Sequence, residues 1–268
     1  MKDKVVIITG GSSGIGKALA FAFGKRGSKI FITGRNQTEL KKAVQELQAV
    51  GIAAASLVAD ASIEAHNQQM AQEAVRTFGR IDVLIANAGI SMRALFEEVD
   101  LAVIRQVMEI NFFGVVYATR YCLPEIKKNH GSIVGMSSIA GYRGLPARSG
   151  YSASKFALNG FLETLRTEYL KDNLHVLTAC PGFTASNIRT RALVKDGTPQ
   201  GDSSLDEGKI MTAEAVAEHI YMAVVKRKRE IILTTNGKLA VFLNKWWPWL
   251  ADRLVYNALK KEPNSPLK

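Results

Sequence analysis

The sequence predicts a doubly wound α/β fold, a mostly parallel seven-stranded sheet with helices on both faces, followed by a C-terminal amphipathic helical extension. Short apolar runs alternate along the chain with longer amphipathic stretches, which is the pattern of successive β–α–β units. The chain has 268 residues and a hydrophobic fraction of 47%. These values suit one large domain with a full core.

Each expected strand is a short run rich in Val, Ile, Thr or Ala. The strands are expected at Val5–Thr9, Lys29–Thr33, Ala53–Val58, Val83–Ala86, Ser132–Met136, Val176–Ala179 and Glu230–Leu233. The stretches between them predict helices near residues 14–26, 37–50, 64–78, 100–127, 150–171 and 213–226. Residues 5–8 and 83–86 are almost wholly apolar, as expected of strands that are buried on both faces.

The alternation covers residues 1–235, which we expect to form a single catalytic domain. Residues 183–212 are rich in Gly, Ser, Asp and Thr, and are too long for a simple connection. We expect this segment to be a lid over a binding site. Residues 236–268 follow the last expected strand and form the helical extension.

The net charge of +11 is concentrated near the C-terminal end, where residues 226–268 hold ten Lys and Arg and three Asp and Glu. This excess favours contact with an anionic surface. No nucleic-acid partner is expected, because the basic residues do not form a recognisable reading motif.

Cysteine and histidine usage argues against a disulfide framework and against a metal site. Only Cys122 and Cys180 occur, and the four histidines have no metal-like spacing. The N-terminus has no signal-peptide pattern, and no uninterrupted apolar stretch reaches the ~20 residues that a spanning helix needs. We therefore expect a cytoplasmic protein, with peripheral contact to a membrane surface as a further expectation.

A glycine-rich turn, Thr9-Gly10-Gly11-Ser12-Ser13-Gly14-Ile15-Gly16, follows the first strand and opens the first helix. Its glycines let the backbone approach a pyrophosphate, and the free N–H groups of the helix N-terminus bind the anion. The position between a strand and a helix predicts a dinucleotide site. The expected contacts are Gly10, Ser12, Ser13, Gly14, Ile15 and Gly16.

The end of the second strand indicates which dinucleotide is bound. NAD-binding chains place a carboxylate about 20 residues beyond the glycines, on the ribose hydroxyls. Here the sequence is Gly34-Arg35-Asn36, without a carboxylate. Arg35 would bind a 2′-phosphate through charge-assisted hydrogen bonds, so NADP(H) is the expected cofactor. The alternative is that Arg35 only stacks on the adenine.

Tyr151 and Lys155 lie four residues apart in an expected helix, so both side chains rise from the same face. Free tyrosine has a pKa of about 10. A neighbouring ammonium stabilises the phenolate, so we expect Lys155, together with a cationic nicotinamide, to lower the pKa of Tyr151. This pair predicts a proton donor.

With these residues, the chain resembles short-chain dehydrogenases/reductases of the classical type from residue 4 to about 235. The resemblance also rests on Asn111, on Ser138 at the family distance before the tyrosine, on Ala86-Asn87-Ala88-Gly89, which departs from the family pattern at Ala86, and on Pro181-Gly182. Hydroxysteroid dehydrogenases and ketosphinganine reductases have a similar layout. The resemblance implies a Rossmann fold and a homodimer or homotetramer, assembled through the helices that carry Asn111 and Tyr151.

The resemblance also implies the roles of individual residues. Tyr151 donates the proton, Lys155 lowers its pKa and holds the nicotinamide ribose, and Ser138 hydrogen-bonds the substrate oxygen. Asn111 would hold a water molecule for proton return if its helix is locally distorted. Further cofactor contacts are implied for Asp60, Ala61, Asn87, Ala88, Gly89, Pro181 and Gly182, beside Arg35, Tyr151 and Lys155.

Several of these residues have a structural alternative. Ser137 and Ser138 could both simply end a strand, and only the family spacing selects Ser138. Asn111 could be a satisfied polar group in a core helix, and Asn87 could be a turn residue. Asp60 could be a helix N-cap.

The C-terminal piece has the sequence pattern of two short amphipathic helices. Leu239, Phe242, Leu243 and Trp246 follow the i, i+3, i+4, i+7 spacing of a helical stripe, and Pro248 suits the first turn of a second helix. All three tryptophans lie at 246–249, among lysines. Peripheral membrane contact through residues 237–261 is one expectation. Closing of the substrate pocket or packing in a subunit interface is the other, and the sequence does not separate them.

These observations predict an NADPH-dependent reductase or dehydrogenase that transfers a hydride to a ketone of a small hydrophobic, lipid-like substrate, with Tyr151 as proton donor. Two alternatives use the same fold. One is a non-catalytic NADP-binding sensor, and the other is a membrane-surface scaffold. The intact set of Ser138, Tyr151 and Lys155 counts against the sensor, which does not need proton transfer.

Overall fold

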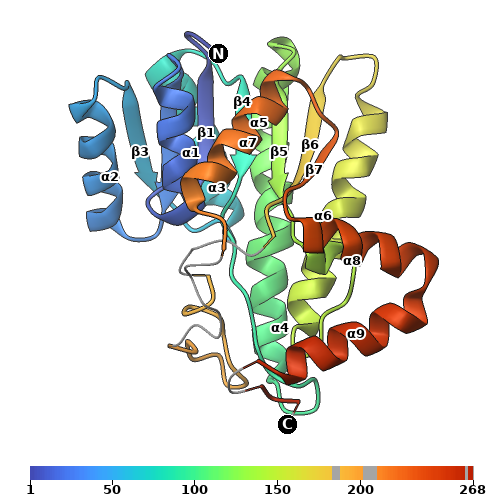
Figure 1. Ribbon diagram of the computed structural model, residues 1–268. Helices are drawn as coiled ribbons and strands as arrows, with labels where there is room; N and C mark the ends of the chain where they lie inside the picture. The colour runs from blue at the N-terminus through green and yellow to red at the C-terminus, as the bar shows by residue number, and fades with distance from the viewer. Residues whose placement is uncertain (183–187, 202–209, 263–264, 268) are drawn as a thin grey trace.

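The structure is a computed structural model that describes residues 1–182, 188–201, 210–262 and 265–267. Within these residues, seven parallel strands form one sheet in the order β3-β2-β1-β4-β5-β6-β7 (Figure 1). The strands are β1 (Val5–Thr9), β2 (Lys29–Gly34), β3 (Ala54–Val58), β4 (Val83–Ala86), β5 (Ser132–Met136), β6 (His175–Cys180) and β7 (Glu230–Ile232). The predicted doubly wound Rossmann fold is confirmed, and each strand lies within one residue of its predicted bounds.

Helices cover both faces of the sheet (Figure 1). They are α1 (Gly14–Gly24), α2 (Gln37–Ala49), α3 (Glu64–Phe78), α4 (Leu101–Met108), α5 (Gly114–Lys128), α6 (Ser149–Glu168), α7 (Ala213–Val225), α8 (Thr235–Trp246) and α9 (Pro248–Lys260). Alternate residues of β1 enter two different cores, as the strand period requires. Val6 and Ile8 pack with α1, α2 and α7, whereas Ile7 packs with α3, α5 and α6.

The predicted helix at 100–127 is interrupted in the middle. A five-residue π-helical segment, η1 (Glu109–Phe113), joins α4 to α5 and carries Asn111. Taken together, α4, η1 and α5 are long and apolar enough to cross a membrane by length and composition, although their apolar residues are not consecutive. Its buried residues, including Val115, Cys122 and Ile126, pack instead in the core beside α3 and α6. In this structure it is a core helix.

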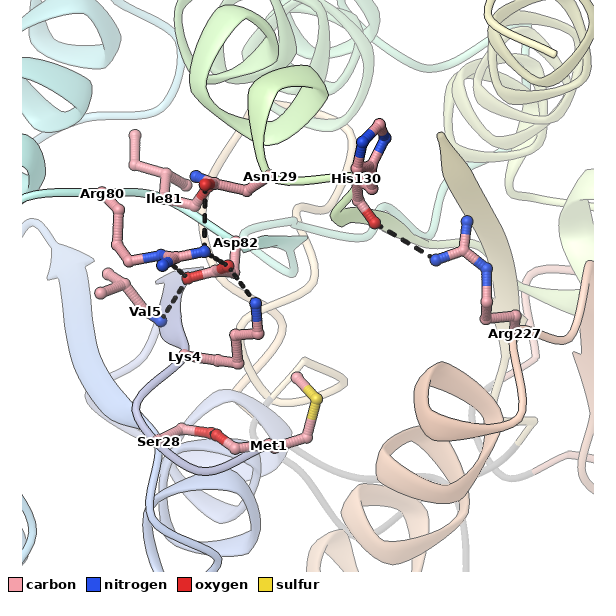
Figure 2. Close-up of polar contacts among 10 residues, drawn as sticks. All are labelled: Met1, Lys4, Val5, Ser28, Arg80, Ile81, Asp82, Asn129, His130 and Arg227. Carbon is pink, nitrogen blue, oxygen red and sulfur yellow. Dashed lines mark hydrogen bonds and ion pairs between the residues drawn. The ribbon is translucent and has the colours of Figure 1, made fainter. Parts of the chain in front are cut away.

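Asp82 joins several chain segments at the amino ends of the strands (Figure 2). It accepts two hydrogen bonds from Arg80, at 2.6 and 2.8 Å, one from Lys4 at 2.9 Å and one from the backbone N–H of Val5 at 3.0 Å. Arg80 also donates to Asn129, whose amide binds the carbonyl of Ile81. These bonds tie the starts of β1 and β4 to the end of α5.

The C-terminal extension is the helical hairpin α8–α9, on the side where the strands end (Figure 1). Three polar residues attach it to the loop before α6. Asn244 donates to the carbonyl of Tyr142 at 2.9 Å and accepts from Arg143 at 2.9 Å, and Arg143 also pairs with Asp252. The predicted apolar stripe of the first helix does not turn inward, because Leu239, Phe242 and Trp246 are exposed.

Candidate active site

The glycine-rich turn lies at the carboxyl end of β1, in the centre of the sheet. Gly10 and Gly14 have left-handed φ values of +65° and +51°, which favour glycine. A Cβ atom on Gly16 would lie 2.2 Å from the carbonyl oxygen of Gly10. Ser13 is the N-cap of α1 and makes no side-chain cap hydrogen bond, so it does not satisfy the first amides of that helix. This geometry fits a bound pyrophosphate.

The segment after β4 holds this turn in place. Asn87 donates its side-chain amide to the carbonyls of Thr9 and Gly10, at 2.9 and 3.1 Å. The backbone N–H groups of Asn87 and Ala88 both donate to the Thr9 hydroxyl, at 3.0 Å. In this structure the side chain of Asn87 therefore fixes the glycine-rich turn, as the alternative of a turn residue predicted.

Arg35 and Asp60 lie at the ends of β2 and β3. Arg35 is exposed, and its charge is one of the influences on Asp60. Burial acts to raise the pKa of Asp60, but two hydrogen bonds from Ser62, at 2.6 and 2.9 Å, and the charge of Arg35 bring it below its ordinary value. Helix α3 starts at Glu64 with Ile63 as its N-cap, so the alternative of Asp60 as an N-cap is wrong. Asp60 instead closes a turn onto Ser62.

Ala61 and Pro181-Gly182 border the same end of the sheet. The carbonyl of Ala61 accepts a hydrogen bond from Asn67 at 2.9 Å and lies against Gly114 at the start of α5. Gly182 has a φ of +75°, and a Cβ atom there would meet Thr234, the N-cap of α8. The expected lid begins just beyond it. Residues 183–187 and 202–209 of that lid lie outside the described residues.

Tyr151 and Lys155 lie on successive turns of α6, and both are buried. The Lys155 ammonium is 5.7 Å from the centroid of the Tyr151 ring and donates a hydrogen bond to the carbonyl of Met136 at 2.8 Å. Ser138 lies close enough to the Tyr151 phenol to act on its pKa. The structure therefore brings three of the four expected catalytic side chains together, at the ends of β5 and α6.

The electrostatics of this pair differ from the expectation. Burial raises the pKa of Tyr151 above its ordinary value, although Ser138 and the charge of Arg148 oppose the rise. Burial also lowers the pKa of Lys155 to about 8. In the chain without cofactor, removal from water outweighs the nearby polar groups. The predicted lowering also depends on a cationic nicotinamide, and stays a prediction.

Asn111 lies close to this pair, in the π-helical segment. Its amide accepts from the N–H of Ile90 at 2.9 Å, and donates to the carbonyl of Ile90 at 2.9 Å and to the hydroxyl of Ser154 at 3.1 Å. A Cβ atom on Gly89 would be 3.1 Å from Asn111 Oδ1 and 3.8 Å from Lys155 Nζ. Asn111 thus sets the position of the backbone beside Lys155, and the expected helix distortion is present.

The two serines after β5 have different partners. Ser137 donates to Asn159 at 2.6 Å, and Asn159 in turn donates to the carbonyl of Gly141 at 2.9 Å. Ser137 is therefore used in the scaffold. The Ser138 hydroxyl accepts one hydrogen bond, from the N–H of Ala140 at 3.2 Å, and lies close enough to act on the Tyr151 phenol. Sequence reasoning missed Asn159 and Ser154. Asn159 lies four residues after Lys155, and Ser154 lies three residues after Tyr151. This helical spacing, which places each beside a selected residue, was the available signal.

An apolar cluster packs around Tyr151. It contains Met92, Ala94, Val99, Val103, Val107, Ala140 and Leu193. Leu193, in the described part of the expected lid, donates its N–H to Ser91 O at 2.9 Å and accepts from Arg93 N at 2.8 Å. The segment after β4 and the lid thus form one wall beside the phenol. This cluster could not be read from the sequence, because it combines four separate segments.

The fold and this arrangement are those of an oxidoreductase that uses a nicotinamide dinucleotide. Comparison with known proteins agrees. A family model described as short chain dehydrogenase matches residues 4–196. The chain belongs to the short-chain dehydrogenase/reductase family, and is an oxidoreductase that acts on CH–OH or C=O groups.

Similar proteins cover nearly the whole chain. Dehydrogenase/reductase SDR family member 7B of Mus musculus is 34% identical, in an alignment that covers 99% of this chain and 84% of the length of the mouse protein. The 11-beta-hydroxysteroid dehydrogenase A of Sesamum indicum is 31% identical over 97% of this chain and 77% of its own. A short-chain dehydrogenase/reductase from Burkholderia phymatum, solved with NAD, covers 93% of this chain and 95% of its own at a TM-score of 0.82 and 24% identity. An archaeal alcohol dehydrogenase from Thermococcus sibiricus, solved with 5-hydroxy-NADP, covers 86% and 95% at a TM-score of 0.75 and 24% identity.

Proposed function

We propose that the protein is an NADPH-dependent reductase that transfers a hydride to the ketone of a hydrophobic, lipid-like substrate, with Tyr151 as the proton donor. The observation that carries this proposal is the burial of Tyr151 and Lys155 on one face of α6, with Ser138 close enough to the phenol to act on its pKa. The same groups serve the reverse reaction, the oxidation of an alcohol.

The raised pKa of Tyr151 suits the start of the reduction. A phenol with a high pKa keeps its proton until negative charge develops on the substrate oxygen. Ser138 and Tyr151 then donate hydrogen bonds to that oxygen. The cofactor supplies the hydride and, once oxidised, a positive charge. Lys155 lies where its ammonium stabilises the phenolate that remains.

The exposed Arg35 supports NADP(H) as the cofactor. It stands at the end of β2, where NAD-binding chains have a carboxylate. Its guanidinium can form paired hydrogen bonds with a 2′-phosphate. The charge of Arg35 also acts on Asp60 at the end of β3, so both residues border the same end of the sheet. The α1 N-terminus and the turn at Gly10–Gly16 would hold the pyrophosphate.

The surroundings of Tyr151 support a hydrophobic substrate. The side chains that face the phenol, among them Met92, Val103 and Leu193, are apolar and buried. Burying each methylene of a ligand there contributes about 0.8 kcal/mol. A ketone with a long apolar chain gains more from this wall than a short polar one.

We also propose that the α8–α9 hairpin contacts an anionic membrane surface. Leu239, Phe242, Trp246, Trp249 and Leu254 are exposed on it. Cations lie beside these aromatic side chains, with Lys245 5.6 Å from the Trp246 ring and Arg253 5.8 Å from the Trp249 ring. Exposed aromatic and basic residues on short helices are typical of interfacial binding. Such contact would place the protein peripherally on a membrane and near lipid-like substrates.

Assembly into a homodimer or homotetramer stays a proposal, through α5 and α6. Phe113, the last residue of η1 directly before α5, and Phe156 on α6 are exposed, and Phe113 stacks on Tyr117 of α5. An apolar surface of this kind is usually covered by a partner.

The test is a panel of ketosteroids, ketosphinganine and medium-chain ketones, with NADPH and NADH supplied in parallel. Loss of nicotinamide absorbance with NADPH and an apolar ketone is the expected result. Cofactor binding without turnover of any member would favour the sensor alternative. Turnover that prefers short polar ketones would contradict the proposed substrate class.

A further inference from the structure

Three ionised side chains from distant segments meet next to α6. Arg93 follows β4, Arg148 is the N-cap residue of α6, and Glu262 lies just beyond α9. Their side chains are 8%, 12% and 12% exposed. Arg93 Nη2 donates to Glu262 Oε2 at 3.1 Å, and Arg148 Nη2 lies 4.0 Å from the same oxygen. A small cavity between them is also lined by Pro146 and Leu259.

Arg148 is poorly satisfied for so buried a group. A guanidinium carries five N–H donors, yet within the described part of the chain the Arg148 guanidinium donates no hydrogen bond, and its ion pair with Glu262 is at the outer limit of distance. A buried charge without hydrogen bonds is costly. Burial accordingly lowers the pKa of Arg148. A purely structural pair such as Arg80 with Asp82 looks different, because both of its hydrogen bonds are short.

This cluster adjoins the reaction centre. Arg148 precedes Tyr151 by three residues, and its charge is among the influences on the phenol. Met92 and Ala94, on either side of Arg93, belong to the apolar cluster around Tyr151. A ligand whose carbonyl is at Tyr151 could therefore lay its apolar part along this wall and bring a charged end to the arginines.

We propose that Arg148, together with Arg93, binds an anionic group at one end of the substrate, a carboxylate or a phosphate. Without substrate, the Glu262 carboxylate occupies the place of this anionic group. The proposal rests on the proposed function and narrows the substrate class from apolar ketones to anionic amphiphiles. Arginine suits both groups because its planar fork pairs with two of their oxygens. Glu262 competes with the substrate for the same donors.

The test uses direct binding, so that it does not depend on turnover. Octanoate, octyl phosphate and octan-1-ol are titrated by calorimetry into the full-length protein in the presence of NADP⁺. An anion that gains charge-assisted hydrogen bonds should bind about 10- to 100-fold more tightly than the alcohol. The tighter of the two anions identifies the group. Equal affinities for all three probes overturn the proposal, even if a ketone is reduced.

Three variants sharpen the result. Arg148→Gln should remove the advantage of the anions over the alcohol, whereas Glu262→Gln, which removes the competing charge, should tighten anion binding several-fold. Arg143→Gln is the matched control, because Arg143 also holds the C-terminal hairpin but lies outside the cluster. If Arg143→Gln and Arg148→Gln weaken all probes equally, the cluster only fastens the hairpin. Unchanged anion binding in Glu262→Gln also contradicts the proposal, and that variant is independent of any folding defect in Arg148→Gln.

Discussion

Asp82 at the amino ends of the strands and Lys155 at their carboxyl ends are both buried and ionisable, yet their surroundings differ. Asp82 accepts hydrogen bonds from Arg80, Lys4 and Val5, and these lower its pKa although burial acts to raise it (Figure 2). The Lys155 ammonium donates one hydrogen bond, to a carbonyl, and has no ion pair within the described residues. Burial lowers its pKa to about 8.

The difference separates a structural charge from a functional one. A buried charge whose partners are present contributes to folding and has little left to offer a ligand. A buried charge without a counter-ion costs stability, and is ready to stabilise an anion that forms beside it. The sheet thus has one end that holds the fold together and one end that carries the chemistry. Each prediction below tests this division.

The largest effect is expected from Tyr151→Phe. Loss of the proton donor should lower the reductase turnover by about 10²–10⁴-fold, whereas NADPH binding should hardly change. Turnover is followed by NADPH absorbance, and binding by cofactor fluorescence. Tyr121→Phe is the matched control, since Tyr121 is a surface phenol that hydrogen-bonds Glu64. Retained turnover in Tyr151→Phe would remove this residue from the proton-donor role.

Opposite effects on stability are expected from Asp82→Asn and Lys155→Met. Asp82→Asn should destabilise the fold by about 1–3 kcal/mol, because charge-assisted hydrogen bonds are lost. The loss stays moderate, since Lys4 and Arg80 are 40% and 41% exposed and can turn to water. Lys155→Met should abolish turnover and stabilise the fold by about 1–3 kcal/mol, because it removes an uncompensated charge. Urea unfolding at pH 7 measures both, and two changes of the same sign would contradict the division.

The lowered pKa of Lys155 also fixes a pH dependence. In the cofactor-free protein the folded-state pKa is about 8 and the unfolded value is 10.5. Between these values the unfolded chain holds the Lys155 proton more than the folded protein does, so the contribution of Lys155 to stability should rise with pH. The cost of burying the charge is fully present below pH 8 and gone above 10.5. The buried thiols of Cys122 and Cys180, whose pKa values burial raises from 9.0 to about 12, act in the opposite direction above pH 9. The stability that Lys155→Met gains over the wild type should therefore shrink as the pH rises from 7 to 10.5, since the thiols are present in both proteins. Urea unfolding of both proteins across this range measures the difference, and a difference that does not change with pH would contradict the assignment.

A smaller effect is expected from Arg35→Asp at the end of β2. The carboxylate should repel a 2′-phosphate and accept hydrogen bonds from ribose hydroxyls. The ratio of kcat/KM for NADPH to that for NADH should fall by about 10- to 100-fold. Lys29→Asp, a charge reversal at the other end of the same strand, is the control. An unchanged cofactor ratio in Arg35→Asp would undo the argument for NADP(H).

The smallest effect is expected from the surface tryptophans. Trp246 and Trp249 are 61% and 59% exposed. Changing both to Ala should lower sedimentation with anionic vesicles by about tenfold or more, because apolar area that would enter the interface is lost. Binding to zwitterionic vesicles should be weak throughout. If the wild type does not sediment with anionic vesicles, only pocket or interface roles remain for the hairpin.

Local features of the fold and site were predictable. Each strand is a β-branched or apolar run with its own turn signals, and the positions of the glycine turn and of Tyr151 and Lys155 follow from helical and strand periods. What the sequence could not supply depends on tertiary contacts. The raised pKa of Tyr151 reflects burial under Met92 and Leu193. The ion pair of Arg93 with Glu262 joins residues that are 169 positions apart, and no local sequence pattern predicts it.

The contacts of Asn111 have a consequence for how the chain can vary. Its amide pairs with both the N–H and the carbonyl of Ile90. One side chain therefore satisfies both backbone groups of Ile90, close to the point where Gly89 passes Lys155. Aspartate offers only acceptors and leucine neither kind of group. The position of the backbone beside Lys155 thus depends on a single carboxamide. A side chain of similar shape, such as leucine, or of similar polarity, such as aspartate, cannot make both of its hydrogen bonds.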